Sequence, residues 1–152
     1  MTQNLETILT DPARRPAVVA DLNELVGQEV KDKGGMSGAA VKLGYQTVSK
    51  IRPGVVPAAV DRMLPQFAGA LQPFYADYRT AGAGTDFGAY LAGRPEAADA
   101  LLGVTDRRAE SSSSDALRKA YAKLRPNARK NVEEALPRLG TLIGRHAASA
   151  GV

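Results

Sequence analysis

The chain has 152 residues and a formal net charge of +4, with one histidine and neither cysteine nor tryptophan. The missing cysteines exclude thiol catalysis and cysteine-ligated metal sites, and the single histidine, His146, excludes a multi-histidine metal centre. A chain of this length is typical of one domain, and it buries enough surface to fold without a metal or a disulfide. We therefore expect a single domain over residues 1–152 with no metal, no cofactor and no catalytic residues.

The first third of the chain shows helical spacing of its apolar residues. No stretch anywhere alternates apolar and polar residues as a strand would, so we predict an all-α fold of six or seven helices. The first helix is expected over residues 2–9, and the second is expected to begin after Asp11–Pro12 and to end at Gly34–Gly35. A third helix is predicted to begin with Ser37 as its N-cap and to end at Arg52–Pro53–Gly54.

The central segment carries the strongest apolar stripe of the sequence. The stripe advances by four and three residues in alternation and consists of Val60, Leu64, Phe67, Leu71, Phe74 and Tyr78. Pro65 and Pro73 lie inside it, and each costs about 3 kcal/mol in a regular helix because it lacks an N–H donor and clashes with the preceding turn. The pattern predicts either one kinked helix or two abutting helices whose shared apolar face is buried.

The second half of the chain contains shorter helical segments, divided by breaks at residues 80–84 and 111–114. Helices are predicted over residues 86–92, from Pro95 to about residue 105, over residues 115–124 with Ser114 as N-cap, and after Pro126. Pro137 is expected to bend or divide the last helix, and residues 1–4 and 147–152 are expected to fray.

The densest cluster of charge lies at residues 118–130, which contain six basic residues and no acidic one. The candidate anion- or nucleic-acid-binding residues are Arg118, Lys119, Lys123, Arg125, Arg129 and Lys130, together with Lys42 in the third helix. Such a patch can neutralise phosphates, but its one aromatic residue, Tyr121, is assigned to the core by its spacing. The alternative is that these charges are solvated or pair with the acidic blocks at residues 1–30 and 63–112.

His146 and the chain's flanks carry little functional signal. The histidine lies on the apolar side of the last helix near its C-terminus, where a partly buried or dipole-stabilised side chain is the ordinary explanation. The N-terminus lacks the basic and apolar regions of a secretory signal, and no apolar run approaches the ~20 residues of a membrane span. We therefore expect a cytoplasmic protein that does not contact a membrane.

Several short sequences, taken in chain order, resemble those of a small family of uncharacterised bacterial proteins. They are DPARRPAVVADL, KGGMSGAAVKLGY, IRPGVVPAAVDRMLP, FGAYLA, LLGVTDRRA and LRKAYAKLRP. The resemblance covers most of residues 5–146. It implies a compact, cytosolic, helical protein, and it transfers no activity and no ligand.

Two functions are left open by the sequence. The first is that of a non-enzymatic protein that acts through contacts with a protein partner or through self-association. The second is weak, sequence-nonspecific nucleic-acid binding through the basic patch at residues 118–130.

Phe67→Ala and Leu71→Ala are each predicted to lower the free energy of unfolding by about 2–5 kcal/mol, as large-to-small changes at buried positions do. Urea and thermal unfolding followed by circular dichroism measure the change. If both variants melt within about a degree of the parent protein, the apolar stripe faces solvent or a partner instead of the core.

Overall fold

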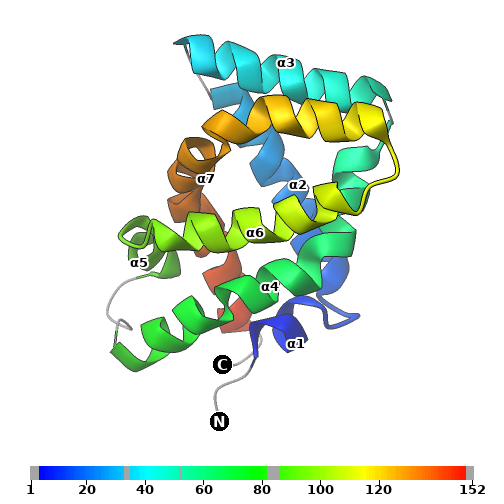
Figure 1. The fold of residues 1–152 in the computed structure, drawn as a ribbon. Coiled ribbons are helices and arrows are strands. Elements are labelled where there is room, and N and C mark those ends of the chain that lie inside the picture. The colour runs from blue at the N-terminus through cyan, green and yellow to red at the C-terminus, as the bar shows by residue number, and fades with distance from the viewer. Residues whose placement is uncertain (1–3, 33–34, 52, 82–85, 150–152) are drawn as a thin grey trace.

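Helix α4 (Val55–Ala81) contacts α1, α2, α3, α5 and α6, and the last helix of the chain contacts the same five helices. The computed structural model describes residues 4–32, 35–51, 53–81 and 86–149, and within these ranges it contains seven helices and no strand. The other six helices are α1 (Leu5–Leu9), α2 (Arg15–Asp32), α3 (Gly35–Ile51), α5 (Phe87–Ala92), α6 (Glu96–Glu110) and α7 (Asp115–Ser149). Figure 1 shows α3 beside the first part of α7 at one end of the molecule and α1 beside α4 at the other. The predicted all-α fold is confirmed, as one compact domain.

The two prolines of α4 bend this helix without dividing it. Pro65 has no N–H to donate to Asp61 O, which lies four residues earlier. Arg15 supplies a replacement, because its Nη2 donates to Asp61 O at 2.7 Å while its Nε donates to Asp61 Oδ1 at 2.9 Å. The predicted stripe faces the core, and Leu64 and Leu71 are each only 1 % exposed. Burial of this face therefore offsets the cost of the prolines.

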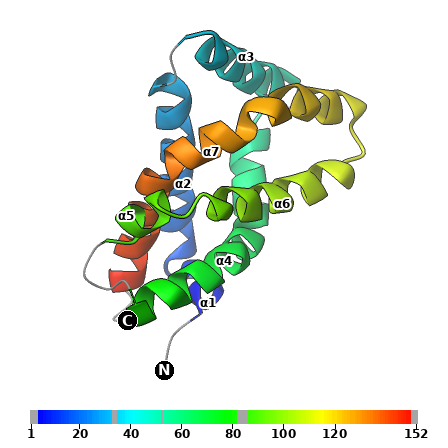
Figure 2. The same ribbon diagram turned by 60° about the vertical axis from the view of Figure 1, so that its left-hand side comes forward.

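Helix α7 continues through both of its prolines, so the predicted helix end at Leu124 is wrong. Contacts on both sides of Pro126 hold the helix together, because Gly44 of α3 lies against Leu124 and Gly88 of α5 lies against Pro137. Figures 1 and 2 show α7 bending between these contacts. Its first part runs beside α3 and its last part packs against α5, α1 and α2.

The remaining boundaries lie close to the predicted ones. The Leu117 N–H donates to Ser114 Oγ at 3.2 Å, which confirms Ser114 as the cap of α7. Helix α3 begins at Gly35, so Ser37 lies inside its first turn and the prediction that Ser37 caps the helix is wrong. Helix α7 extends to Ser149, three residues beyond His146. The predicted break at residues 80–84 and the predicted stop at Gly34 lie largely outside the described residues.

Helix α5 packs tightly on α7 through two glycines. Gly88 and Gly140 are both buried, and a Cβ on Gly140 would lie 2.6 Å from Gly88 Cα. Asp86 fixes the start of α5, since its Oδ1 accepts from the Ala89 N–H at 2.7 Å and its Oδ2 from Thr141 Oγ1 at 2.7 Å. On the opposite side of α5 is an aromatic cluster with ring centroids 5.2–6.3 Å apart, formed by Tyr75, Tyr78, Phe87 and Tyr90.

Gly140→Ala is predicted to destabilise the fold by about 1–3 kcal/mol, because the added methyl group forces α5 away from α7. Gly69→Ala in α4 is the matched control, since a Cβ at Gly69 meets no atom within 4 Å. This control is expected to be stabilised by about 0.5–1 kcal/mol, as alanine is preferred in a helix interior. Thermal unfolding distinguishes the two variants, and equal melting temperatures would contradict a close α5–α7 contact.

Candidate functional site

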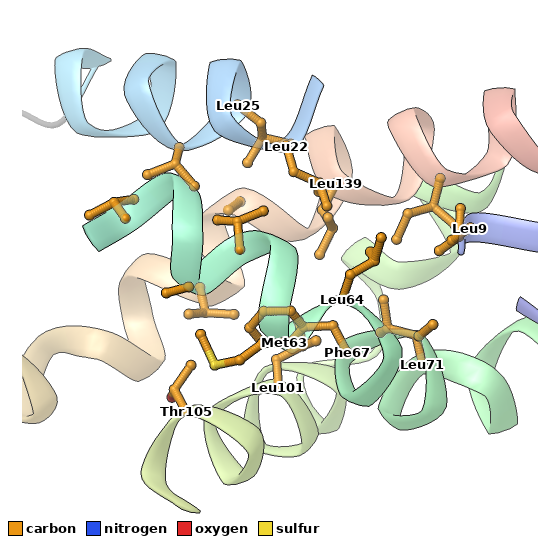
Figure 3. A pocket seen from close by; sticks show the side chains of 18 of the residues that line it. Leu9, Leu22, Leu25, Met63, Leu64, Phe67, Leu71, Leu101, Thr105 and Leu139 are labelled. Carbon is orange, nitrogen blue, oxygen red and sulfur yellow. The ribbon is translucent and has the colours of Figure 1, made fainter. Parts of the chain in front are cut away.

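An apolar cavity of about 330 Å³ lies among five helices (Figure 3). Helix α4 supplies its longest wall, with Val55, Val56, Ala59, Val60, Met63, Leu64, Phe67, Ala68 and Leu71. The other helices supply Leu9 from α1, Leu22, Leu25 and Val26 from α2, Leu101, Leu102 and Thr105 from α6, and Val132, Ala135, Leu139 and Ile143 from α7. Among these described residues, Thr105 alone has a polar side chain.

The burial of the lining residues changes from one end of the cavity to the other. Leu9 and Leu71 are almost completely buried and close one end. Val56, Val132 and Met63 are only half-buried, so the rest of the cavity retains contact with solvent. The cavity is therefore an apolar pocket that is closed at Leu9 and Leu71 and partly open along its other walls.

The cavity is lined almost entirely by aliphatic side chains. The chain has eight aromatic residues, of which four form the cluster around α5, and Phe67 is the one aromatic residue among the described residues that line the cavity. Of the twenty lining residues, eight are leucine and eight are valine or alanine. The apolar surface that lines this space is poorly hydrated, so an apolar ligand that covers it would be stabilised by the hydrophobic effect.

The polar atom of Thr105 is already occupied by contacts within the protein. Its Oγ1 donates to Leu102 O at 3.0 Å and lies 2.8 Å from the Tyr121 hydroxyl, which in turn donates to Asp106. Burial and the hydrogen bond to Asp106 raise the pKa of Tyr121. The cavity wall therefore has no free hydrogen-bonding side chain among the residues described.

Two ion pairs join α6 to the first part of α7 beside the cavity; we call them the α6–α7 clamp. Arg125 Nε lies 2.9 Å from Asp106 Oδ1, and Arg129 Nε lies 2.9 Å from Asp99 Oδ1. In both pairs a second guanidinium nitrogen donates to the other carboxylate oxygen at 3.2 Å. The hydrogen bond from Arg125, and then that from Tyr121, lower the pKa of Asp106, and the hydrogen bond from Arg129 lowers the pKa of Asp99.

The structure divides the predicted basic residues into two groups. Three arginines of α7 are paired with carboxylates, since Arg118 binds Asp115 and the other two form the clamp. The lysines are exposed, with Lys119, Lys123 and Lys130 on α7 and Lys42 on α3. The arginine pairing corresponds to the alternative in which the basic segment meets the acidic blocks of the same chain.

His146 is partly buried and its Nε2 lies 2.7 Å from Asp21 Oδ2, so it connects α7 to α2. Within the described ranges, no three His, Asp or Glu side chains lie close enough together to hold a metal ion. None of the helices in these ranges has the length and apolar character needed to cross a membrane.

The cavity is the feature that sequence reasoning missed. The sequence identifies its lining residues as apolar and places the α4 stripe in the core. The available signals were the scarcity of aromatic residues and the four prolines inside α4 and α7. These features predict bent helices and small side chains, but the volume left between the helices depends on their paths in space.

Comparison with known proteins identifies one family. The model of a family of unknown function (DUF6918) matches residues 5–147, which confirms the resemblance to an uncharacterised family over most of the chain. No curated protein and no solved structure matches the chain.

The α6–α7 clamp predicts a loss of stability in acid. Because the folded-state pKa values of Asp99 and Asp106 are lowered, the stabilisation is present above the unfolded value of about 3.9 and disappears as the pH falls through the folded-state pKa values. The melting temperature of the parent protein is expected to fall between pH 5 and pH 2. In the Asp99→Asn/Asp106→Asn variant this fall should be smaller, whereas Asp77→Asn, at an exposed position of α4, should behave like the parent. Identical pH profiles for all three proteins would contradict the clamp.

Proposed function

Because the chain belongs to a family of unknown function (DUF6918), which assigns it no activity, we propose from the geometry of the site that it is a non-enzymatic binding protein. Its ligand is a hydrocarbon chain, such as the alkyl chain of a single-chain amphiphile, held in the apolar cavity. The observation that carries the proposal is a cavity of about 330 Å³ whose described wall offers one polar side chain, Thr105, already hydrogen-bonded within the protein.

The apolar character of the cavity wall favours a hydrocarbon ligand. A buried amide or hydroxyl without a hydrogen-bond partner costs roughly 1–3 kcal/mol in proteins, and a peptide or a nucleotide would bring several such groups into the cavity. A hydrocarbon brings none. It also gains about 25 cal/mol for each Å² of apolar surface removed from water.

The size of the cavity is consistent with this ligand class. An apolar cavity of about 150 Å³ holds one benzene molecule, and ligand pockets range from about 300 to 1,000 Å³. At about 330 Å³ the cavity is large enough for a single flexible chain. Since it is blind at Leu9 and Leu71, the chain would enter methyl end first.

The two functions suggested by the sequence have less support. Protein contacts or self-association would use exposed apolar surface, and among the described residues only Leu43 and Ile51 are large hydrophobic side chains that are strongly exposed. Weak nucleic-acid binding would rely on the exposed lysines, because Arg118, Arg125 and Arg129 already bind carboxylates. Both remain proposals with fewer observations behind them than the cavity has.

Ala59→Phe is predicted to abolish binding of a neutral alkyl probe, because Ala59 lines the cavity and a phenyl ring there occupies the space of the ligand. The matched control is Ala58→Phe, at the neighbouring but exposed position of α4. Dodecanol at about 100 times its Kd should raise the unfolding free energy of the parent and of the control by about 2.7 kcal/mol, and that of Ala59→Phe by nearly nothing.

Thermal unfolding with and without dodecanol measures the effect. Unliganded Ala59→Phe should melt near the parent, which separates loss of binding from loss of the fold. An unchanged melting temperature of the parent in dodecanol, or equal stabilisation of both phenylalanine variants, would show that the cavity does not bind hydrocarbon.

A further inference from the structure

A second, polar pocket lies directly beside the apolar cavity. It is a groove of about 280 Å³ between α4 and α6, and we call it the arginine groove. Its lining includes Arg62 from α4 and Arg107 and Arg108 from α6, with Ser111 at the end of α6. Among the described residues, none of these three guanidinium groups pairs with a carboxylate, in contrast to the arginines of the α6–α7 clamp.

The three arginines of the groove are exposed to solvent, so their guanidinium groups are accessible to an anion. Each guanidinium presents several N–H donors in a planar fork that matches the oxygens of a carboxylate or a phosphate. The position of Arg107 and Arg108 near the C-terminus of α6 is favourable for the helix dipole. The dipole does not account for Arg62, which comes from a different helix and adds a third positive charge to the same groove.

The arginine groove and the apolar cavity meet at Met63. This side chain lines both, and Figure 3 shows it next to Leu101 and Thr105 in the cavity. On α6 the cavity-facing Thr105 is followed within one turn by the groove-facing Arg108. Methionine is unbranched and flexible, so it is the side chain most suited to move aside between two neighbouring pockets.

We propose that the arginine groove binds the anionic head group, a phosphate or a carboxylate, of the same amphiphile whose alkyl chain lies in the apolar cavity. This assignment rests on the proposed function and specifies the ligand as a single-chain anionic amphiphile. The chain crosses from the groove to the cavity past Met63, and Arg62, Arg107 and Arg108 hold the head group. A free phosphate would satisfy the same arginines without using the cavity, so the experiment must separate the two sources of the anion.

Three probes separate the head group from the chain: dodecyl phosphate, dodecanol and inorganic phosphate. Isothermal titration calorimetry of the full chain should give a Kd for dodecyl phosphate at least about tenfold lower than that for dodecanol, since hydrogen bonds to charged groups contribute that much. In Arg62→Ala/Arg107→Ala this preference should disappear while dodecanol binds as before. The control, Lys119→Ala/Lys123→Ala, removes the same charge from exposed positions of α7 and should keep the preference.

Three other results would contradict the assignment of the arginine groove, and each points to a different explanation. Equal affinity of the parent protein for dodecyl phosphate and dodecanol removes the head-group site but leaves the cavity function intact. A preference that the lysine variant also loses assigns the effect to net charge. Binding of inorganic phosphate alone, lost in the arginine variant and accompanied by no binding of either alkyl probe, contradicts both proposals and makes the groove a site for a free anion.

Discussion

The continuity of α4 and α7 through four internal prolines is the constraint on which the rest of the structure depends. Each proline removes a backbone donor at a cost of about 3 kcal/mol or more in a regular helix, so the helices persist only where other interactions offset that cost. Arg15 does so locally at Pro65, by donating to the carbonyl of Asp61 that the proline leaves without a partner. Elsewhere the offset comes from apolar burial, for example of Leu71 and Leu136, each 1 % exposed.

The bends explain why the molecule has both a tightly packed end and an open one. At the α5 end, Gly88 and Gly140 let two helices approach closely, and aromatic rings occupy the remaining space. At the other end, α2, α4 and α7 contribute to the cavity wall, in which Phe67 is the one aromatic residue among those described. The cavity thus lies where aromatic rings are scarce, and an alkyl ligand would complete the core.

Local features of the fold could be predicted from the sequence because they depend on spacing and capping. The stripe from Val60 to Tyr78 faces the core, and Ser114 caps α7, as the pattern indicates. The features that could not be predicted depend on contacts between residues that are far apart in the sequence. The two ion pairs of the α6–α7 clamp join residues 19 and 30 positions apart, and whether Pro126 ends a helix depends on contacts that α7 makes with α3 and α5.

The pairing of charged side chains is another feature that the sequence does not predict, and it bears on function. Residues 118–130 stand out in the sequence because six basic residues are concentrated there, yet the arginines of this segment bind carboxylates of the same chain. Arg62 and Arg107 are separated by 45 positions and form no visible pattern in the sequence, but they line one groove without an acidic partner among the described residues. The paired guanidinium groups of α7 already direct N–H donors at carboxylates, whereas Arg62 and Arg107 make no such pair among the described residues and can direct their donors at an anion. Which basic side chains are paired is determined by the fold, and the charge density of the sequence does not show it.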